Sequence, residues 1–217
     1  MEPNLINSVG PFLITSLISL FIIIDPPGNI FPYLALSASY SPTATRGLAW
    51  QACLYAFFIL TLVALVGRLI LHYVGITIPA FQIAGGLILL RIAIDMLEGH
   101  GHFNRFDTSS SLDAADYRGV ALVPLAVPLL SGPGAISTVL VLTSRSSSSL
   151  EVSLVVLSLL IILLLTYIFF RFAQVLLNYL KETGIRLLTR LMGLIMAALA
   201  VQFILDGLVA AFPVLKP

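Results

Sequence analysis

The stretch that decides the fold is Asp25-Pro26-Pro27-Gly28-Asn29-Ile30-Phe31-Pro32. It directly follows an apolar run from Phe12 to Ile24, which is typical of a helix in a membrane. Each proline removes a backbone donor and clashes with the preceding turn, and hydrocarbon offers no water to the carbonyls that lose their partners. Such backbone is tolerated at membrane depth only where protein or a wet cavity surrounds it. The stretch therefore predicts a broken helix that faces something polar.

A second interruption lies inside a later apolar segment and reads Pro128-Leu129-Leu130-Ser131-Gly132-Pro133-Gly134-Ala135-Ile136-Ser137. Pro27-Gly28-Asn29-Ile30 aligns with Pro133-Gly134-Ala135-Ile136 at an offset of 106 residues, since 133 minus 27 is 106. Paired interruptions at corresponding positions in two halves of a chain indicate the binding site of a transporter.

The composition is that of an integral membrane protein. Of the 217 residues, 59% are apolar and only 10% are charged, whereas soluble domains carry about 25% charged residues, and the mean hydropathy is +1.07. No basic cluster typical of nucleic-acid binding occurs. The single cysteine, Cys53, excludes an intrachain disulfide. Because residues 1–10 contain no Lys or Arg, we expect the first helix to be retained and not cleaved as a signal peptide.

The predicted fold is an all-α membrane protein with six transmembrane helices, of which the first and fourth are broken. The expected spans cover approximately residues 9–37, 43–73, 79–97, 120–143, 150–179 and 186–212.

These spans divide into two repeats of three helices. We expect a first repeat at 1–98, a cytoplasmic loop at 99–118 and a second repeat at 119–217. The match extends beyond the breaks, because Gly85 and Gly193 correspond at an offset of 108. Since three is an odd number of crossings, the second repeat enters the membrane from the opposite side, which predicts an inverted repeat.

The distribution of Lys and Arg predicts the orientation. The richer side carries Arg46, Arg105, Arg118, Lys181, Arg186 and Arg190, and the other side carries Arg68, Arg145 and Lys216. We expect the richer side to be cytoplasmic, which places both termini on the extracytoplasmic side of the cell membrane.

Asp25 is the most informative single residue, because an ionisable group inside a span is a functional hypothesis by default. Three roles remain open: proton carrier, ligand of the coupling cation, and helix N-cap. The last is reasonable on local grounds, because Asp followed by Pro is a favourable helix start.

The two breaks predict new helix halves that begin at Gly28-Asn29 and at Gly134-Ala135. The N-terminus of a half-helix presents unpaired amides and a partial positive charge, which suits a carboxylate. Ser131 and Ser137 flank the second break. Their hydroxyls either bind a substrate or recapture backbone carbonyls.

Other polar residues admit structural readings. Arg91 and Asp95 are four residues apart and either pair with each other or leave Arg91 as an anion ligand. Further candidates for buried hydrogen bonds between helices are Gln82, Asn178 and Gln202.

Neither a metal site nor an enzyme is expected. His100-Gly101-His102 lies in the long loop without the spacing of a metal site. H-E-x-x-H, G-x-S-x-G and P-loop motifs do not occur, and no cofactor is expected.

Several segments together resemble the MarC family of integral membrane proteins. They are the Asp25-Pro26-Pro27-Gly28-Asn29 break, residues 78–88 and 123–128, the Gly132-Pro133-Gly134 break and residues 190–195. The resemblance covers nearly the whole chain, and its SnatA-type members are transporters of small neutral amino acids, driven by a cation gradient. It implies a binding site formed by Asp25, Gly28, Asn29, Ser131, Gly132, Gly134 and Ala135.

The sequence and the resemblance favour a secondary transporter of glycine and alanine, coupled to protons or sodium. Its partners would be the amino acid, the cation, the lipid bilayer and possible further copies of the chain, and no nucleic acid. The half-helix N-termini would hold the substrate carboxylate, and Asp25, Asn29 or Ser131 would hold its ammonium group or the cation. The alternatives are an exporter of drugs or other metabolites and, less favoured, a channel that needs a ring of Asp25 side chains on an oligomer axis.

Overall fold

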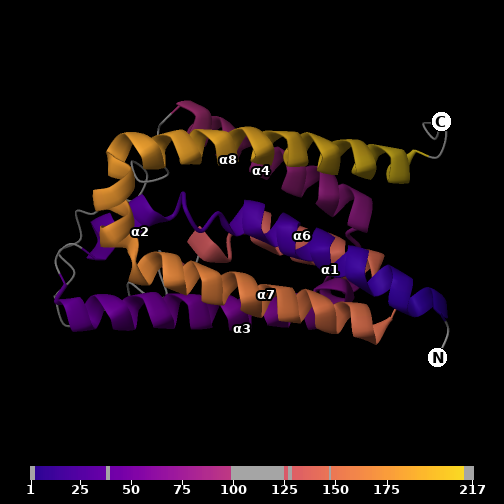
Figure 1. Ribbon diagram of the computed structural model, residues 1–217. Helices are drawn as coiled ribbons and strands as arrows, with labels where there is room; N and C mark the ends of the chain where they lie inside the picture. The colour runs from indigo at the N-terminus through magenta and orange to yellow at the C-terminus, as the bar shows by residue number, and fades with distance from the viewer. Residues whose placement is uncertain (1–2, 38–39, 99–124, 127–128, 147, 213–217) are drawn as a thin grey trace.

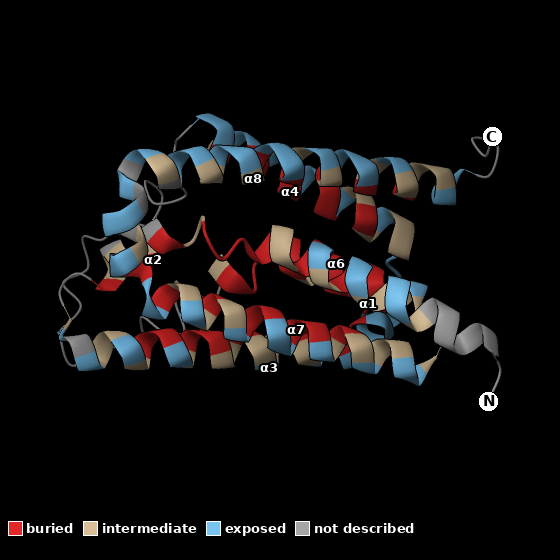
Figure 2. Cartoon of the chain, viewed as in Figure 1, coloured by how far each residue is buried: buried red, intermediate tan, exposed pale blue. Residues whose placement is uncertain are grey.

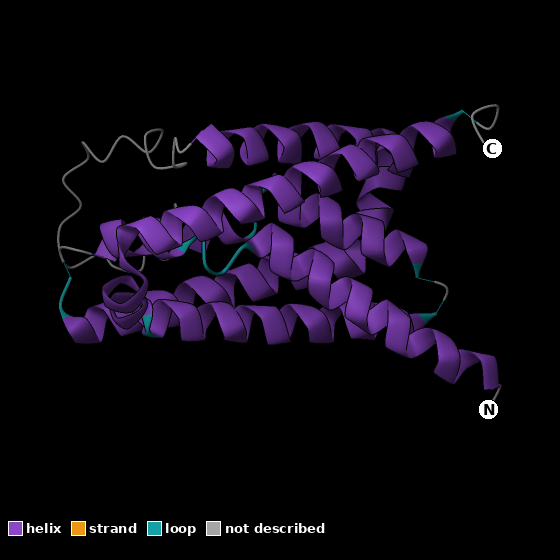
Figure 3. Cartoon of the chain, turned by 45° about the horizontal axis from the view of Figure 1, so that its top comes forward, coloured by secondary structure: helices purple, strands orange, loops and turns teal. Residues whose placement is uncertain are grey.

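The computed structural model describes residues 3–37, 40–98, 125–126, 129–146 and 148–212, and the regular structure of these residues is entirely helical (Figures 1 and 3). The helices are α1 (Pro3–Ile24), α2 (Ile30–Ser37), α3 (Pro42–Val74), α4 (Ile78–Glu98), α6 (Pro133–Arg145), α7 (Ser149–Arg171) and α8 (Ala173–Ala211). They pack in three layers: α4 with α8, α1 with α6 in the middle, and α3 with α7 (Figure 1).

Within the described residues, four helical segments are long and apolar enough to cross a membrane. They are Thr43–Val74, Ile78–Glu98, Ser149–Arg171 and Arg186–Ala211. Val9–Ile24 is apolar but shorter. These segments match the second, third, fifth and sixth predicted spans, and they confirm a multi-pass helical membrane protein.

The first and fourth predicted spans are interrupted where the sequence predicts. α1 ends at Ile24, immediately before Asp25, and α2 begins at Ile30. The helical turns at 125–126 and 129–130 are separated from α6 by Ser131 and Gly132. The inverted relation of the two halves remains a prediction, as does their orientation in the membrane, although the Pro3 end of α1 and the Ala211 end of α8 lie at the same end of the molecule (Figure 1).

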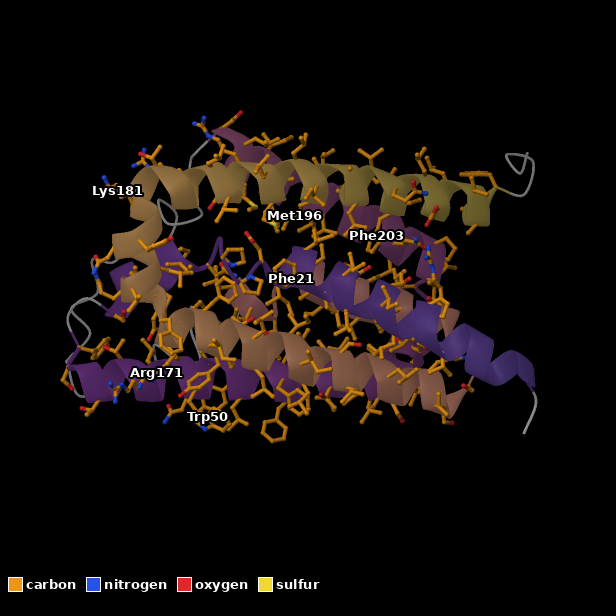
Figure 4. The ribbon with its side chains drawn as sticks, viewed as in Figure 1. Phe21, Trp50, Arg171, Lys181, Met196 and Phe203 are labelled. Carbon is orange, nitrogen blue, oxygen red and sulfur yellow. The ribbon has the colours of Figure 1, made fainter. Side chains whose placement is uncertain are left out.

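The prediction for the fifth span is wrong at its end. The span was expected to reach residue 179, but α7 ends at Arg171 and the chain turns at Phe172. The 23 residues of α7 already cover about 34 Å, which exceeds the ~30 Å of bilayer hydrocarbon. The following residues cross the end of the bundle and turn again at Lys181, with φ 55° (Figure 4). The expected stop near Lys181 is therefore a bend within α8.

Glycines allow α4 to lie close to its two neighbours, α8 and α6. A Cβ on Gly86 would lie 2.8 Å from the carbonyl oxygen of Ala200 in α8. The adjacent Gly85 instead faces Ser137 of α6. In Figure 4, Met196 and Phe203 lie on the inner side of α8, and both are buried. The layer of α4 and α8 therefore meets the middle layer through close helix contact and large apolar side chains.

The short helix α2 is fixed by one aromatic residue. Tyr33 is buried, and its ring stacks on Phe170 of α7 with centroids 4.4 Å apart. Its hydroxyl donates to the carbonyl oxygen of Thr45 in α3 at 2.9 Å. These contacts fix the chain on one side of the first break.

Candidate functional site

Side chains within the first break form hydrogen bonds to its backbone. The backbone N–H of Asp25 donates to the carbonyl of Phe21 at 2.9 Å, which is the last helical bond of α1. Asp25 then adopts φ 46°, a left-handed conformation that Asp tolerates better than most residues. The side-chain amide of Asn29 donates to the carbonyl of Ile24 at 2.6 Å. The N–H of Gly28 donates to Oδ1 of Asp25 at 3.2 Å. Both polar side chains therefore satisfy backbone groups, the Gly28 N–H and the Ile24 carbonyl, that would pair with each other if the helix continued.

The Asp25 carboxylate explains the glycine at position 28. A Cβ on Gly28 would overlap this carboxylate, so any larger residue would displace it. Asp25 is only 5% exposed, and none of the described Lys, Arg or His residues forms an ion pair with it. Burying an ionised carboxylate without a cation is costly. The helix-cap role is thus visible in the geometry, and the carboxylate still needs a proton or a cation when it is buried.

In the second break, Ser131 forms two hydrogen bonds to the preceding helical turn. Its hydroxyl and its backbone N–H both donate to the carbonyl of Ala126, at 2.8 and 2.9 Å. Ser131 therefore recaptures a backbone carbonyl, which is one of the two roles predicted for it. Gly132 follows in extended conformation and contributes no side-chain cap to α6, and Pro133 occupies the first turn.

The N-terminus of α6 differs from the turn before α2. The amides of Gly28 and Asn29 are both taken up inside the first break, by the side chain and the carbonyl of Asp25. In contrast, the amides of Gly134 and Ala135 form no backbone hydrogen bond with any described residue. The partial positive charge expected at a helix start is therefore more available at α6.

The two breaks lie close together in the middle layer (Figures 1 and 2). A Cβ on Gly134 would overlap the side chain of Leu89 in α4 and would lie 3.8 Å from Cγ2 of Ile23 in α1. Ile23 is two residues before Asp25. Ser137, one turn further along α6, packs against Gly85. The predicted site residues at both breaks are thus brought to one buried region, although Ala135 packs into the apolar core.

The remaining polar candidates divide by burial. Asn178 and Gln202 are exposed, and Gln202 donates to Asp206 at 2.6 Å. Gln82 is buried, and its Nε2 has no hydrogen-bond partner among the described residues. Arg91 is exposed on α4, and the described ion pairs do not include one between it and Asp95. Neither predicted role of Arg91 is therefore supported, and His100 and His102 lie outside the described residues.

Sequence reasoning missed two polar features. Ser16 is fully buried in α1, and its hydroxyl has no partner among the described residues. The sequence feature that could have indicated it is the spacing of Ser16 and Ser19, which lie three residues apart within an apolar run. At the outer ends of α6 and α8, Arg145 donates to Asp206 at 2.5 Å. That contact joins residues 61 positions apart, so no local pattern could indicate it.

Comparison with known proteins agrees with this architecture. The family model described as "MarC family integral membrane protein" matches residues 10–212. A UPF0056 membrane protein of Methanocaldococcus jannaschii is 38% identical over 201 residues, covering 93% of this chain and 88% of the relative. A UPF0056 membrane protein of Bacillus subtilis is 32% identical over 205 residues, covering 94% and 97%.

A UPF0056 membrane protein of Escherichia coli is 32% identical over 196 residues, covering 90% of this chain and 91% of the relative. No solved structure matches the chain. The family match extends over both breaks and over every long apolar helix of the structure. The chain belongs to the MarC family of integral membrane proteins.

Proposed function

We propose that this protein is a secondary transporter of small neutral amino acids, such as glycine and alanine, and that a proton or sodium gradient drives it. The observation that carries the proposal is the meeting of two helix breaks in the buried middle layer. One break supplies Asp25, which has no cationic partner among the described residues. The other supplies the α6 N-terminus, which has no side-chain cap. Buried sites of this kind are expected at the centre of transporters.

The two breaks offer opposite charges to a zwitterion. The amides of Gly134 and Ala135, at the positive end of α6, suit the carboxylate of an amino acid. Asp25 suits the ammonium group or the coupling cation, with oxygen atoms of Asn29 and Ser131 as further candidate ligands. One buried carboxylate and one helix terminus match a substrate with no net charge. A lysine or arginine substrate would call for an additional buried acid.

Small residues next to the site favour a small substrate. A Cβ on Gly134 would overlap Leu89, and a Cβ on Gly85 would overlap Ser137. Because neither position has space for one added carbon, the region has little room for bulky side chains. This favours glycine and alanine over the larger solutes of a drug exporter.

The layers suggest how access alternates. α4 packs mainly on α8, and this pair meets the rest of the molecule chiefly where α4 crosses α6. Movement of the α4–α8 pair against the middle layer would open the breaks to one side at a time, in the manner of rocking repeats. The Arg145–Asp206 ion pair joins the two bodies at one end.

Ligand-dependent stabilisation of the purified protein tests the substrate class. A ligand that binds only the folded state stabilises it by about 2.7 kcal/mol at a concentration of 100 Kd. We expect glycine and alanine to raise the thermal unfolding midpoint in detergent, and lysine and glutamate to leave it unchanged. A rise with larger hydrophobic solutes, and none with the two amino acids, would favour the exporter.

A further inference from the structure

Gln82 has an unusual environment for an amide in a membrane helix. The side chain is 6% exposed, and its Nε2 finds no acceptor among the described residues. It lies on the buried face of α4 together with Gly85, Gly86 and Leu89. Because an unpaired polar group in an apolar interior is costly, the Nε2 group of Gln82 requires a hydrogen-bond acceptor that no described residue provides.

Ser16 presents the same feature on α1. It is 0% exposed, and its hydroxyl has no partner among the described residues. Several buried hydroxyls in other helices, those of Thr138, Ser158 and Thr166, donate to the carbonyl one turn earlier in their own helix. Ser158 is an example, since it is equally buried and donates to the carbonyl of Leu154 at 2.8 Å. Ser16 therefore does not form the hydrogen bond to a carbonyl of its own helix that is available to a helical serine.

The contacts of α6 place these two residues at one level of the molecule. A Cβ on Gly134 would overlap Leu89 of α4 and would lie 3.8 Å from Cγ2 of Ile23 in α1, so both residues are neighbours of this position. α6 runs antiparallel to α1 and α4 (Figure 1). Moving seven residues along each neighbour, away from the breaks, leads from Ile23 to Ser16 and from Leu89 to Gln82. Both moves cover about 10 Å. Ser16 and Gln82 thus flank α6 at the same distance from the breaks, toward the Arg145 end.

We propose that Ser16 and Gln82 form an outer polar subsite, which an amino acid contacts before it reaches the helix breaks. This inference rests on the proposed transport of small neutral amino acids. The Nε2 group of Gln82 donates to the substrate carboxylate, and the Ser16 hydroxyl accepts from its ammonium group or donates to its carboxylate. The subsite lies between the breaks and the Arg145–Asp206 ion pair, toward the end of the molecule that the distribution of Lys and Arg predicts to be extracytoplasmic.

Thiol accessibility tests the subsite without requiring transport. The chain has one cysteine, so Cys53→Ala gives a cysteine-free background. Ser16→Cys and Gln82→Cys are introduced singly and treated with a membrane-impermeant methanethiosulfonate reagent in right-side-out vesicles. Ser158→Cys is the matched control, because Ser158 is equally buried but already hydrogen-bonded. We expect labelling at 16 and 82, at least tenfold faster than at 158, and slowing of at least threefold by saturating alanine or glycine.

The possible outcomes separate the inference from the proposed function. Labelling at 16 and 82 no faster than at 158 would overturn the subsite, even if uptake of alanine is demonstrated. Fast labelling that neither amino acid slows would also overturn it and would indicate a hydrated region only. If uptake fails for glycine and alanine but either amino acid slows labelling at 16 and 82, the subsite stands as a binding site, and the proposed transport is refuted.

A second experiment separates binding from folding. Ser16→Ala and Gln82→Met remove a hydroxyl and an Nε2 group that have no hydrogen-bond partner among the described residues, so neither should lower the thermal unfolding midpoint. Both should raise the half-saturating alanine concentration for uptake at least threefold. Ser158→Ala should leave that concentration unchanged. A lowered midpoint with unchanged uptake would assign Ser16 and Gln82 a structural role and contradict the subsite.

Discussion

The two roles of Asp25 predict different results for Asp25→Asn and Asp25→Ala. Asn keeps an oxygen that accepts from the Gly28 N–H, a bond of 3.2 Å in the structure. Asn also tolerates the left-handed backbone that residue 25 adopts at φ 46°. Ala loses both features. The comparison therefore separates the helix cap from the ionisable group.

The expected magnitudes follow from these two losses. Loss of a capping hydrogen bond costs about 1 kcal/mol, and a residue with an ordinary Cβ in the left-handed region costs about 1 kcal/mol more. Asp25→Ala should therefore destabilise the protein by about 2 kcal/mol. For a chain of this size, that corresponds to a midpoint about 4–8 °C lower. Asp25→Asn should change the midpoint by less than about 2 °C on the same scale.

The transport assays complete this prediction. An amide can neither carry a proton nor neutralise a cation, so Asp25→Asn should lower gradient-driven uptake at least about tenfold, an effect of 1.4 kcal/mol or more. Exchange of external for internal alanine, which needs no net movement of the cation, should persist. Gradient-driven uptake at the wild-type rate would refute the coupling role and leave Asp25 as a helix cap. Equal loss of stability in both variants would refute the reasoning about the cap.

Three further substitutions test other parts of the structure. Gly134→Val would overlap Leu89 and should abolish uptake while gel filtration shows assembled protein; aggregation would make the glycine structural. Gly86→Ala places a Cβ 2.8 Å from a backbone oxygen of α8, so the free energy of unfolding should fall by about 1–3 kcal/mol. An unchanged unfolding midpoint would contradict this close packing. Arg145→Gln removes an ion pair whose arginine is 52% exposed, so the free energy of unfolding should fall by at most about 1 kcal/mol. This decrease should become smaller at high salt, which screens exposed charges. A larger decrease that does not depend on salt would refute a surface ion pair.

The breaks could be predicted because proline and glycine act locally. In Asp25-Pro26-Pro27-Gly28, two successive prolines and a glycine strongly disfavour a continued helix, so the end of α1 at Ile24 was predictable from the sequence. The start of α3 was also predictable, since Ser41 precedes Pro42 and accepts from the N–H of Ala44.

Features that depend on packing could not be predicted in this way. The turn at Phe172 contains neither proline nor glycine, and α7 ends there once it has the length of a membrane crossing. The contact between Gly85 and Ser137 and that between Gly134 and Leu89 depend on how α6 and α4 cross. The burial of Ser16 Oγ and Gln82 Nε2 without a hydrogen-bond partner among the described residues likewise depends on tertiary packing. Residue type alone indicated the membrane helices but not which polar groups remain without partners.

A gradient-driven carrier with its substrate site at the two breaks can be tested by uptake of radiolabelled glycine and alanine into proteoliposomes, with and without an imposed proton or sodium gradient. We expect saturable uptake that one of the two gradients stimulates and that dissipation of this gradient abolishes. No uptake under either gradient by protein shown to be folded, or a flux that rises with concentration without saturation, would contradict it.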